Sequence, residues 1–469
     1  MEKKEQKSPL PLITAIGLGV LLVTALLLLF FAKPLKGRQE AGVLTSGASW
    51  RIAVLSDSML SGENKMADAM NQRNTKQALA LAQQHSVQYI FWAGGMTKGG
   101  AQAHYNAYQK TYQGVYKQNN KQPVTIAVMG AEELGGSATP AWTLRRFAAK
   151  KNMAQPPFSH HVVNGLHILA LSADQTGKSP YSASALGWLK RELQRAAEEA
   201  QGRPILVLSP QPPADTVYGS DEFGSQALHD ILADYPTAVS ISGGTRRPQT
   251  DIRMIWQGEY TAIGCQGLSY VSFEDGLFNP FLDGGTDGAR RPQDADKKPY
   301  MLILEIDDNK ITVQRWNVLD AAQERGGSPW TLMLPLKQET FSHTVQRRDA
   351  ANKEPWFSTV LMQPADPIPA DGGRFLDGVT FIAAEDDDRV AYYEMEAVSW
   401  LNTVTVKRYP ADTFLGDANA SARVTLALDP RLPSGEYSVK VYAVDSFGRR
   451  SAGYQQCKLN HKQRIQAEK

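Results

Sequence analysis

A carboxylate stands at the end of the first apolar run after the N-terminal region. RIAVLS, residues 51–56, has the composition of a buried strand, and Asp57 follows it directly. The carboxyl ends of parallel strands are where α/β proteins collect their chemistry, so this carboxylate is a candidate metal ligand. Two residues later, where a second ligand would be expected, the chain carries Met59. The spacing indicates a strand of the kind that carries a metal site. It leaves open whether the residues after this strand can bind a metal ion.

Asp57 allows two interpretations. It could be a remnant ligand for one weak cation, and with Glu132 and Glu133 it could form an oxygen-rich Ca²⁺ site. The simpler interpretation, which we favour, is a strand-end carboxylate that accepts backbone N–H groups or pairs with Arg246. Glu132 and Glu133 are then solvated loop acids.

Positive charge follows one of two glycine pairs. Residues 94–95 and 243–244 are Gly-Gly, and Arg246 and Arg247 come shortly after the second pair. Free backbone N–H groups and guanidinium groups both favour anions. Arg246 and Arg247 are therefore candidate anion-binding residues.

Other titratable clusters have simpler explanations. His160, His161 and His167 fall in a segment that is typical of a β-hairpin with its turn at 164–165. His161 and His167 lie six residues apart, which is not the His-x-His spacing of a metal site, and we interpret all three histidines as structural. The acidic run 386–388 indicates a solvated turn.

The elements that must position these residues alternate from Trp50 to about residue 250. We expect strands over 51–56, 87–95, 124–130, 205–210 and 237–244, a hairpin over 161–172, and helices over 74–85, 101–117 and 182–200. The last helix is the clearest, because leucines recur at helical spacing after Ser182 or Ser184 as a cap. The order strand, helix, strand predicts a parallel sheet with helices outside it.

After residue 250 the predicted helices stop. Strands are expected over 254–264, 268–274, 300–307 and 311–319, and 328–336 leads into a further region. From about 354 to 456, short strands alternate with Pro, Gly and Asp turns, which predicts an immunoglobulin- or fibronectin-like β-sandwich. The chain has two cysteines, Cys265 and Cys457, which exclude a disulfide framework and leave their own pairing open.

The residues that follow five successive strands resemble, in order and spacing, the motifs of the calcineurin-like metallophosphoesterases. They are LSDSM (55–59), AGGMTK (93–98), MGAEEL (129–134), LSPQPP (208–213) and SGGTRR (242–247), against D-x-H, G-D-x-x-D, G-N-H-D/E, a lone His and G-H-x-H in the family. The segments SPQPPADTVYGS and IWQGEYTAIG extend the similarity beyond the motifs. The resemblance implies an α/β fold, a four-layer αββα sandwich, over roughly residues 50–335.

The resemblance also implies two divalent metal ions, for which the family uses seven Asp, Asn or His ligands. Asp57 alone matches. The other ligand positions carry Met59, Gly95, Ala131, Pro210, Gly244 and Arg246, and the position of the catalytic His carries Glu132. A glycine, alanine or proline has no coordinating side chain, and Arg246 would place a permanent positive charge where a dication belongs. We therefore expect no metal, no cofactor and no intact catalytic residue.

The N-terminal region predicts a membrane anchor. Residues 10–32 form an unbroken uncharged stretch, and about 20 apolar residues cross a bilayer. No small-residue cleavage site ends the stretch, which favours an uncleaved anchor over a signal peptide, although lysines on both sides weaken the argument for its orientation. The 50 Lys+Arg and 48 Asp+Glu nearly balance, so no nucleic-acid partner is implied. We expect a single-pass cell-membrane protein with the bulk of the chain extracytoplasmic.

The expected organisation runs in order along the chain. It comprises a short cytoplasmic tail (1–9), a transmembrane anchor (10–32), a linker (33–48), a metallophosphoesterase-like domain (49–336), a β-sandwich (337–460) and a tail (461–469). We expect a binding or scaffolding pseudoenzyme that recognises an unknown extracytoplasmic ligand or protein. One alternative is a metal-dependent phosphoester hydrolase with ligands other than the family's, and another is an inactive domain that only positions the sandwich.

Overall fold

The computed structural model describes most of the chain after residue 48. The described residues are 49–63, 65–116, 122–135, 158–176, 179–274, 276–281, 286–289, 298–324, 328–370, 373–411 and 422–462. They belong to one compact unit, Glu40–Lys469. The predicted anchor over 10–32 lies outside the described residues. Within the ranges given above, no helix is both long and apolar enough to span a membrane.

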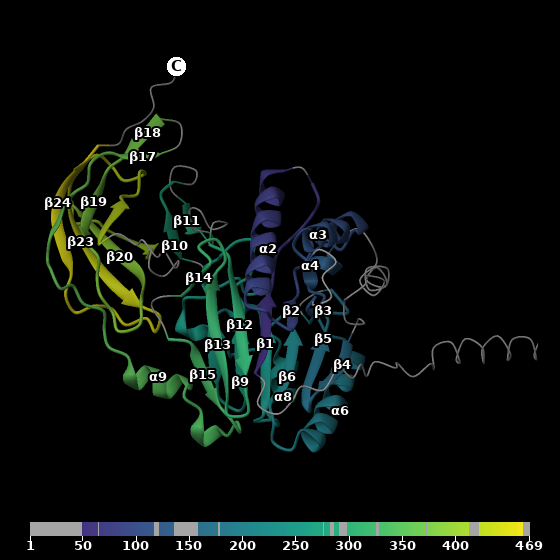
Figure 1. Ribbon diagram of the computed structural model, residues 1–469. Coiled ribbons are helices and arrows are strands. Elements are labelled where there is room, and N and C mark those ends of the chain that lie inside the picture. Colours follow the sequence, from purple (N-terminus) through teal and green to yellow (C-terminus); the bar gives the residue numbers. More distant parts are fainter. Residues whose placement is uncertain are drawn as a thin grey trace, which may run out of the picture. The chain divides into compact units, whose positions relative to one another are not determined.

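The first sheet carries the opening strand of the chain. Its order is β14-β13-β12-β1-β2-β3, with β15 also paired to β13. The strands are β1 (Trp50–Leu55), β2 (Tyr89–Ala93), β3 (Val124–Val128), β12 (Tyr300–Ile306), β13 (Lys310–Asn317), β14 (Ala322–Gln323) and β15 (Trp330–Met333). β1, β2 and β3 are parallel, and β12 is antiparallel to β1. Leu55 and Trp92 belong to a cluster with the helices α2 (Met66–Gln84) and α3 (Gln102–Val115), which cover one face of this sheet (Figure 1).

The second sheet has the order β4-β5-β6-β7-β9-β8. Its strands are β4 (Phe158–Val163), β5 (Leu166–Leu171), β6 (Ile205–Ser209), β7 (Ala238–Ser242), β8 (Ile255–Gln257) and β9 (Thr261–Gly264). Leu169 and Val207 pack with Leu189 and Leu193 of α6 (Ala183–Ala200), and α8 (Gln226–Leu232) belongs to the same cluster. These helices therefore cover the outer face of the second sheet.

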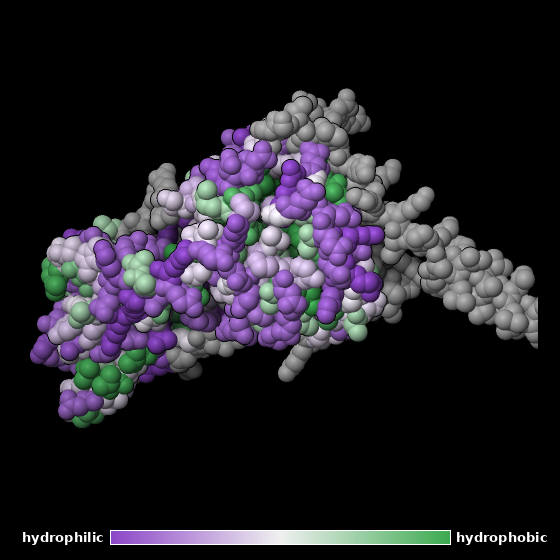
Figure 2. Space-filling view, turned by 90° about the horizontal axis from the view of Figure 1, so that it is seen from below, coloured by the Kyte–Doolittle hydropathy of each residue, from purple (hydrophilic) through white to green (hydrophobic). Residues whose placement is uncertain are grey.

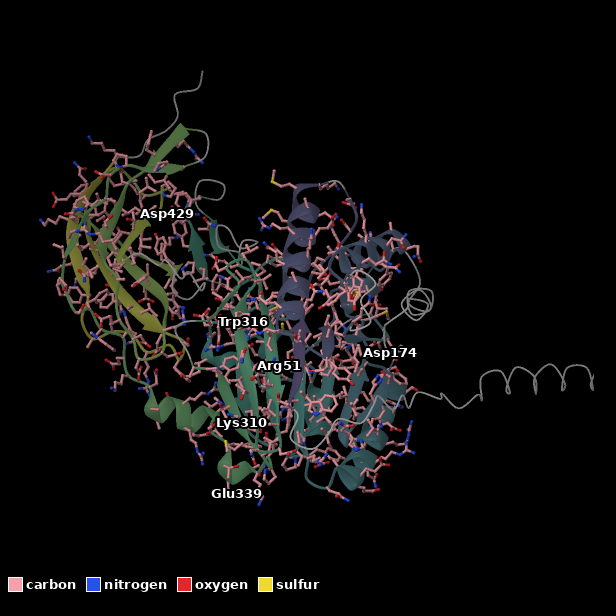
Figure 3. All side chains as sticks on the ribbon, in the orientation of Figure 1. Arg51, Asp174, Lys310, Trp316, Glu339 and Asp429 are labelled. Atoms are coloured by element: carbon pink, nitrogen blue, oxygen red, sulfur yellow. The ribbon has the colours of Figure 1, made fainter. Side chains whose placement is uncertain are left out.

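Local sequence signals explain two of these elements. α6 begins after Ser182, whose side chain accepts a hydrogen bond from the N–H of Ala185 at 3.2 Å. The carboxylate of Asp174, labelled in Figure 3, holds the Ser182 N–H at 2.7 Å. The β4–β5 hairpin turns at Asn164 and Gly165, whose φ angles of 48° and 75° suit an Asn-Gly turn. Both elements were predicted from the sequence.

The inner faces of the two sheets pack against each other. Ile52 and Phe91 of the first sheet share one buried cluster with Ile168, Leu206 and Ile241 of the second. Helices lie on the outer faces, so the order of layers is helix, sheet, sheet, helix. The α/β core expected from the sequence is confirmed.

The C-terminal part is rich in strands. A six-stranded sheet has the order β11-β10-β21-β20-β23-β24, a three-stranded sheet the order β16-β19-β22, and β17 pairs with β18. The strands are β10 (Leu277–Asn279), β11 (Thr286–Ala289), β16 (Met362–Pro364), β17 (Ile368–Ala370), β18 (Arg374–Leu376), β19 (Gly378–Ile382), β20 (Val390–Ser399), β21 (Val404–Pro410), β22 (Arg423–Ala427), β23 (Gly435–Asp445) and β24 (Gln455–His461). The helix α9 (Val345–Ala351) lies in the chain between β15 and β16. The predicted boundary at residue 336 does not separate the sheets, because β10 pairs with β21 through Leu277 and Arg408.

The predicted strand over 268–274 is wrong. Its backbone instead bonds to the loops at the strand ends of the core. Leu268 and Ser269 donate their N–H groups to the carbonyls of Ser56 and Asp57, both at 3.0 Å. The N–H of Ser272 reaches the carbonyl of Arg246 at 2.8 Å. The apolar alternation of the segment therefore serves packing against these loops and not a sheet ladder.

The acidic run 386–388 is not the solvated turn that was predicted. One carboxylate oxygen, Oδ2, of both Asp386 and Asp388 is buried and has no hydrogen-bond partner within the described part of the chain. Burial, together with the negative charge of the nearby Asp251, raises the pKa of Asp388 to about 7. The neighbouring Arg389 pairs with Glu324 of the α/β core, which places this turn beside the core.

This arrangement predicts a pH-dependent stability. The folded state holds a proton on Asp388 more tightly than the unfolded state, where the ordinary value is 3.8. Stability from this group is therefore greatest below pH 4 and falls as the pH rises to about 7. We expect urea unfolding to show a smaller loss of stability between pH 5 and pH 8 in Asp388→Asn than in the wild type. Asp387→Asn, at an exposed position, is the control, and equal slopes in all three proteins would contradict the prediction.

Candidate functional site

Asp57 is buried at the point where β1 ends. Its side chain is 3% exposed. One carboxylate oxygen, Oδ2, accepts the N–H of Gly244 at 3.0 Å and the hydroxyl of Ser56. The other, Oδ1, accepts the Nε–H of Arg246 at 3.1 Å. The backbone hydrogen bonds and the arginine pairing that we favoured from the sequence are therefore both present.

Arg246 bridges the loops that follow three different strands. Its Nη2 lies 3.0 Å from Oδ1 of Asp57, after β1, and 2.5 Å from Oε1 of Glu132, in α4 (Ala131–Leu134) after β3. Arg246 itself follows β7. Its side chain is 15% exposed. Burial disfavours the charged guanidinium, but the two carboxylates outweigh this and raise the pKa of Arg246. The guanidinium is therefore a permanent cation that contacts carboxylate oxygens of Asp57 and Glu132.

Two further side chains complete the surroundings of Arg246. Its Nη1 donates to the hydroxyl of Tyr270, and the guanidinium carbon lies 4.8 Å from the centre of that ring. The sulfur of Met59 is 3.7 Å from Nη2. Tyr270 was missed from the sequence because it belongs to the segment mistaken for a strand, and nothing in its local pattern indicates a partner 24 residues away.

Glu133 differs from the solvated loop acid that we predicted. Its side chain is fully buried. The carboxylate accepts the N–H groups of Thr97 at 2.7 Å, Gly130 at 2.8 Å and Gly95 at 3.2 Å. Burial raises its pKa to about 7, although the N–H groups of Thr97 and Gly130 oppose the rise. Glu133 joins the loop after β2 to the loop after β3, and its oxygens face donors and not a cation.

The glycines at two positions that resemble ligand positions of the family leave no room for a side chain. A Cβ at Gly95 would lie 2.7 Å from Oδ1 and 2.9 Å from Cα of Asp57. A Cβ at Gly244 would lie 2.6 Å from the carbonyl oxygen of Pro210. Both residues have positive φ angles, 61° and 83°, which only glycine adopts without strain. Neighbouring backbone and side-chain atoms therefore occupy the space that a larger side chain at either position would need.

The residues present do not fit two divalent metal ions. The structure gathers Met59, Gly95, Pro210, Gly244 and Arg246 around Asp57, as the motif order implies, but Asp57 alone of these is a hard oxygen ligand. Ala131 begins α4 and has no coordinating atom. Across the described residues, no three His, Cys, Asp or Glu side chains are placed to hold a metal ion. Asp57 and Glu132 converge on a guanidinium.

Arg247 lies deeper than Arg246. It is 2% exposed, and its Nη2 donates to Glu222 at 2.8 Å. The rings of Tyr218 and Phe223 flank its guanidinium at 5.4 Å and 5.5 Å. Its Nε and Nη1 are buried and have no partner among the residues that the structure describes. Since carboxylates already engage Arg246 and Arg247, an anion would have to compete with them, and anion binding here stays a prediction.

The three histidines form contacts within the β4–β5 hairpin and with α6. His160 hydrogen-bonds through Nδ1 to Glu192 at 2.7 Å and through Nε2 to His167 at 2.9 Å. His161 contacts the hydroxyl of Ser159 at 2.9 Å, and burial lowers its pKa to about 4. These contacts fit the structural role that we assigned to the histidines.

The two cysteines, whose pairing the sequence left open, are both free thiols. Cys265 is fully buried. Burial raises its pKa to about 12, which makes it an unreactive member of the core.

Comparisons with known proteins find similarity in structure alone. No family model matches the chain, and no curated protein matches it. GAP50, the anchor in the inner membrane complex of Plasmodium, is 18% identical over 62% of this chain and 89% of its own, with a TM-score of 0.41. A dimetal phosphatase from Danio rerio (9% identity, 61% of this chain, 98% of its own) and the purple acid phosphatase PPD1 from yellow lupin, Lupinus luteus (9%, 61% and 54%), have the same TM-score of 0.41. Similarity at this level of identity concerns the fold alone.

Proposed function

We propose that this chain is a membrane-anchored, non-catalytic relative of the metallophosphoesterases that binds or organises another molecule outside the cytoplasm. The observation that carries the proposal is the guanidinium of Arg246, held between Asp57 and Glu132 where the family places its metal ions. Two like charges a few Å apart repel strongly in a site of low dielectric. A divalent ion would therefore have to displace Arg246 before it could use either carboxylate.

The Arg246 contacts suit a structural role. They join loops that follow β1, β3 and β7, and so connect the two sheets of the core at their carboxyl ends. A buried ion pair is a poor source of net stability, but it specifies one arrangement of the groups that it joins. A core whose loops are held in one arrangement can present a fixed surface to a binding partner. The same fold can serve binding in one protein and catalysis in another, because function depends on the site built on it.

Exposed apolar side chains support a binding role for the β-rich part. Trp400 and Leu401, in the turn between β20 and β21, are 71% and 65% exposed, and Val404 and Val406 of β21 are about half exposed. Figure 2 shows a mostly hydrophilic surface with small hydrophobic areas, and some of these lie over the β-rich part. Clustered exposed apolar residues mark interaction sites more often than single ones do.

Metal content and turnover test the proposal together. The full-length chain, purified in detergent, should contain no stoichiometric Mn, Fe or Zn by elemental analysis. It should also not hydrolyse a phosphodiester dye above the blank when Mn²⁺ or Zn²⁺ is added, because the described residues contain no set of side chains placed to hold the ion. Metal-dependent turnover that disappears in Asp57→Ala would overturn the proposal in favour of a hydrolase with ligands other than the family's.

A further inference from the structure

A cavity of about 290 Å³ lies between the α/β core and the β-rich part. Tyr218, Arg253, Phe273 and Glu274 line it from the core side of the chain, and Tyr392 of β20 and Phe447, in the turn after β23, line it from the other. None of these residues occupies a ligand position of the family. The cavity is therefore distinct from the Arg246 site.

The guanidinium in the wall is already neutralised. Arg253 donates through Nη2 and Nε to Asp251, with a shortest distance of 2.6 Å. Its guanidinium also lies 3.8 Å from the centre of the Tyr218 ring. Burial disfavours the charged form of Arg253, but Asp251 outweighs this and raises its pKa. The pair contributes little net charge to the cavity.

The carboxylates in the wall are not neutralised. Glu274 is exposed and forms no ion pair among the described residues, although its charge also acts on the nearby Arg253, which Asp251 already pairs. Asp445 accepts its hydrogen bonds from neutral donors, which are the N–H groups of Phe447 and Arg449 at 2.8 Å and the side-chain amide of Asn352 at 2.6 Å. The wall therefore carries uncompensated negative charge, which disfavours an anionic occupant.

Aromatic rings provide the rest of the wall. Tyr392 and Phe447 are half-buried, and Tyr218 and Phe273 are buried. The guanidinium of Arg408 lies 5.2 Å from the centre of the Tyr392 ring, so a further cation would use the rest of that ring. The negative face of an aromatic ring attracts cations, and rings combined with a carboxylate are how proteins recognise alkylated ammonium groups.

From this combination we propose that the cavity binds a small organic cation, an alkylated ammonium group on a compact molecule. Glu274 provides the opposite charge, and the rings of Tyr392 and Phe447 contact the alkyl groups. The occupant needs no metal, and the proposal stands whether or not the Arg246 site binds one.

Calorimetric titration of the full-length chain with tetramethylammonium chloride tests this site. Saturable binding is expected, weakened about tenfold in Glu274→Gln because the opposite charge is lost, and similarly in Tyr392→Leu. Glu259→Gln, an exposed acid that does not line the cavity, should bind like the wild type. Higher salt at constant pH should weaken the binding.

Three results would overturn the site. The wild type could show no saturable binding, Glu274→Gln and Tyr392→Leu could both bind like the wild type, or methanesulfonate could bind more tightly than tetramethylammonium. Because Glu274 is exposed, Glu274→Gln is expected to fold normally, and its unfolding temperature checks this. Metal content plays no part in the readout, so this test and that of the proposed function fail separately.

Discussion

Replacing Arg246 by alanine should lower the free energy of unfolding by about 3–5 kcal/mol, the usual cost of leaving one member of a buried ion pair without its partner. The carboxylate of Asp57 would then be left almost fully buried with its neutral donors only. Glu132, whose side chain is 39% exposed, would turn to water and contribute little to the loss. Urea unfolding followed by circular dichroism measures the change.

Two comparisons show whether the effect comes from charge. Arg408→Ala removes a guanidinium that is 51% exposed and paired with Glu394 at 3.2 Å, and it should cost about 1 kcal/mol or less. Adding Asp57→Asn to Arg246→Ala should recover part of the lost stability, since it removes the unpaired charge. If Arg246→Ala were no more costly than Arg408→Ala, the guanidinium would not be the structural replacement that we describe.

Introducing an aspartate at the position that resembles the family's bridging ligand, as Gly95→Asp, should destabilise the protein by about 2–4 kcal/mol and should not create a metal site. A residue other than glycine at a φ of 61° costs about 1 kcal/mol, and overpacking typically costs about 1–3 kcal/mol more. The overpacking is severe because the new Cβ would lie 2.9 Å from the Cα of Asp57, which is backbone and does not rotate away.

Gly114→Asp is the matched control for this substitution. Gly114 lies on α3 with no atom within 4 Å of its would-be Cβ, so the same change should alter stability by only about 0.5 kcal/mol or less. Both variants are compared by urea unfolding and by Mn²⁺ titration. Two results would contradict the prediction: a Gly95→Asp protein as stable as the wild type, or one that binds Mn²⁺ when the wild type does not. Either would show that the space beside Asp57 can accept a further side chain.

Elements defined by short-range interactions were predictable from the sequence. The leucine spacing and Ser182 cap of α6 and the Asn-Gly turn of the β4–β5 hairpin depend on neighbours within one or two turns of chain. The prediction of a strand over 268–274 failed because the alternating residues fit a strand pattern. The N–H groups of this segment instead bond to loops at the strand ends of the core, which are distant in the sequence. The prediction that Glu133 is a solvated acid failed for the same reason, since the loop that buries its side chain lies 36 to 38 residues earlier in the chain.

The sequence by itself determined which residue types stand at the positions that resemble the family's ligand positions, because a residue type is independent of the fold around it. Only the tertiary structure decided how these residues contact one another. Arg246 and Asp57 stand 189 residues apart and meet because the two sheets pack face to face with their strand ends at one edge. The positive φ angles and closed glycine positions that exclude new ligands likewise exist only once those loops are in contact.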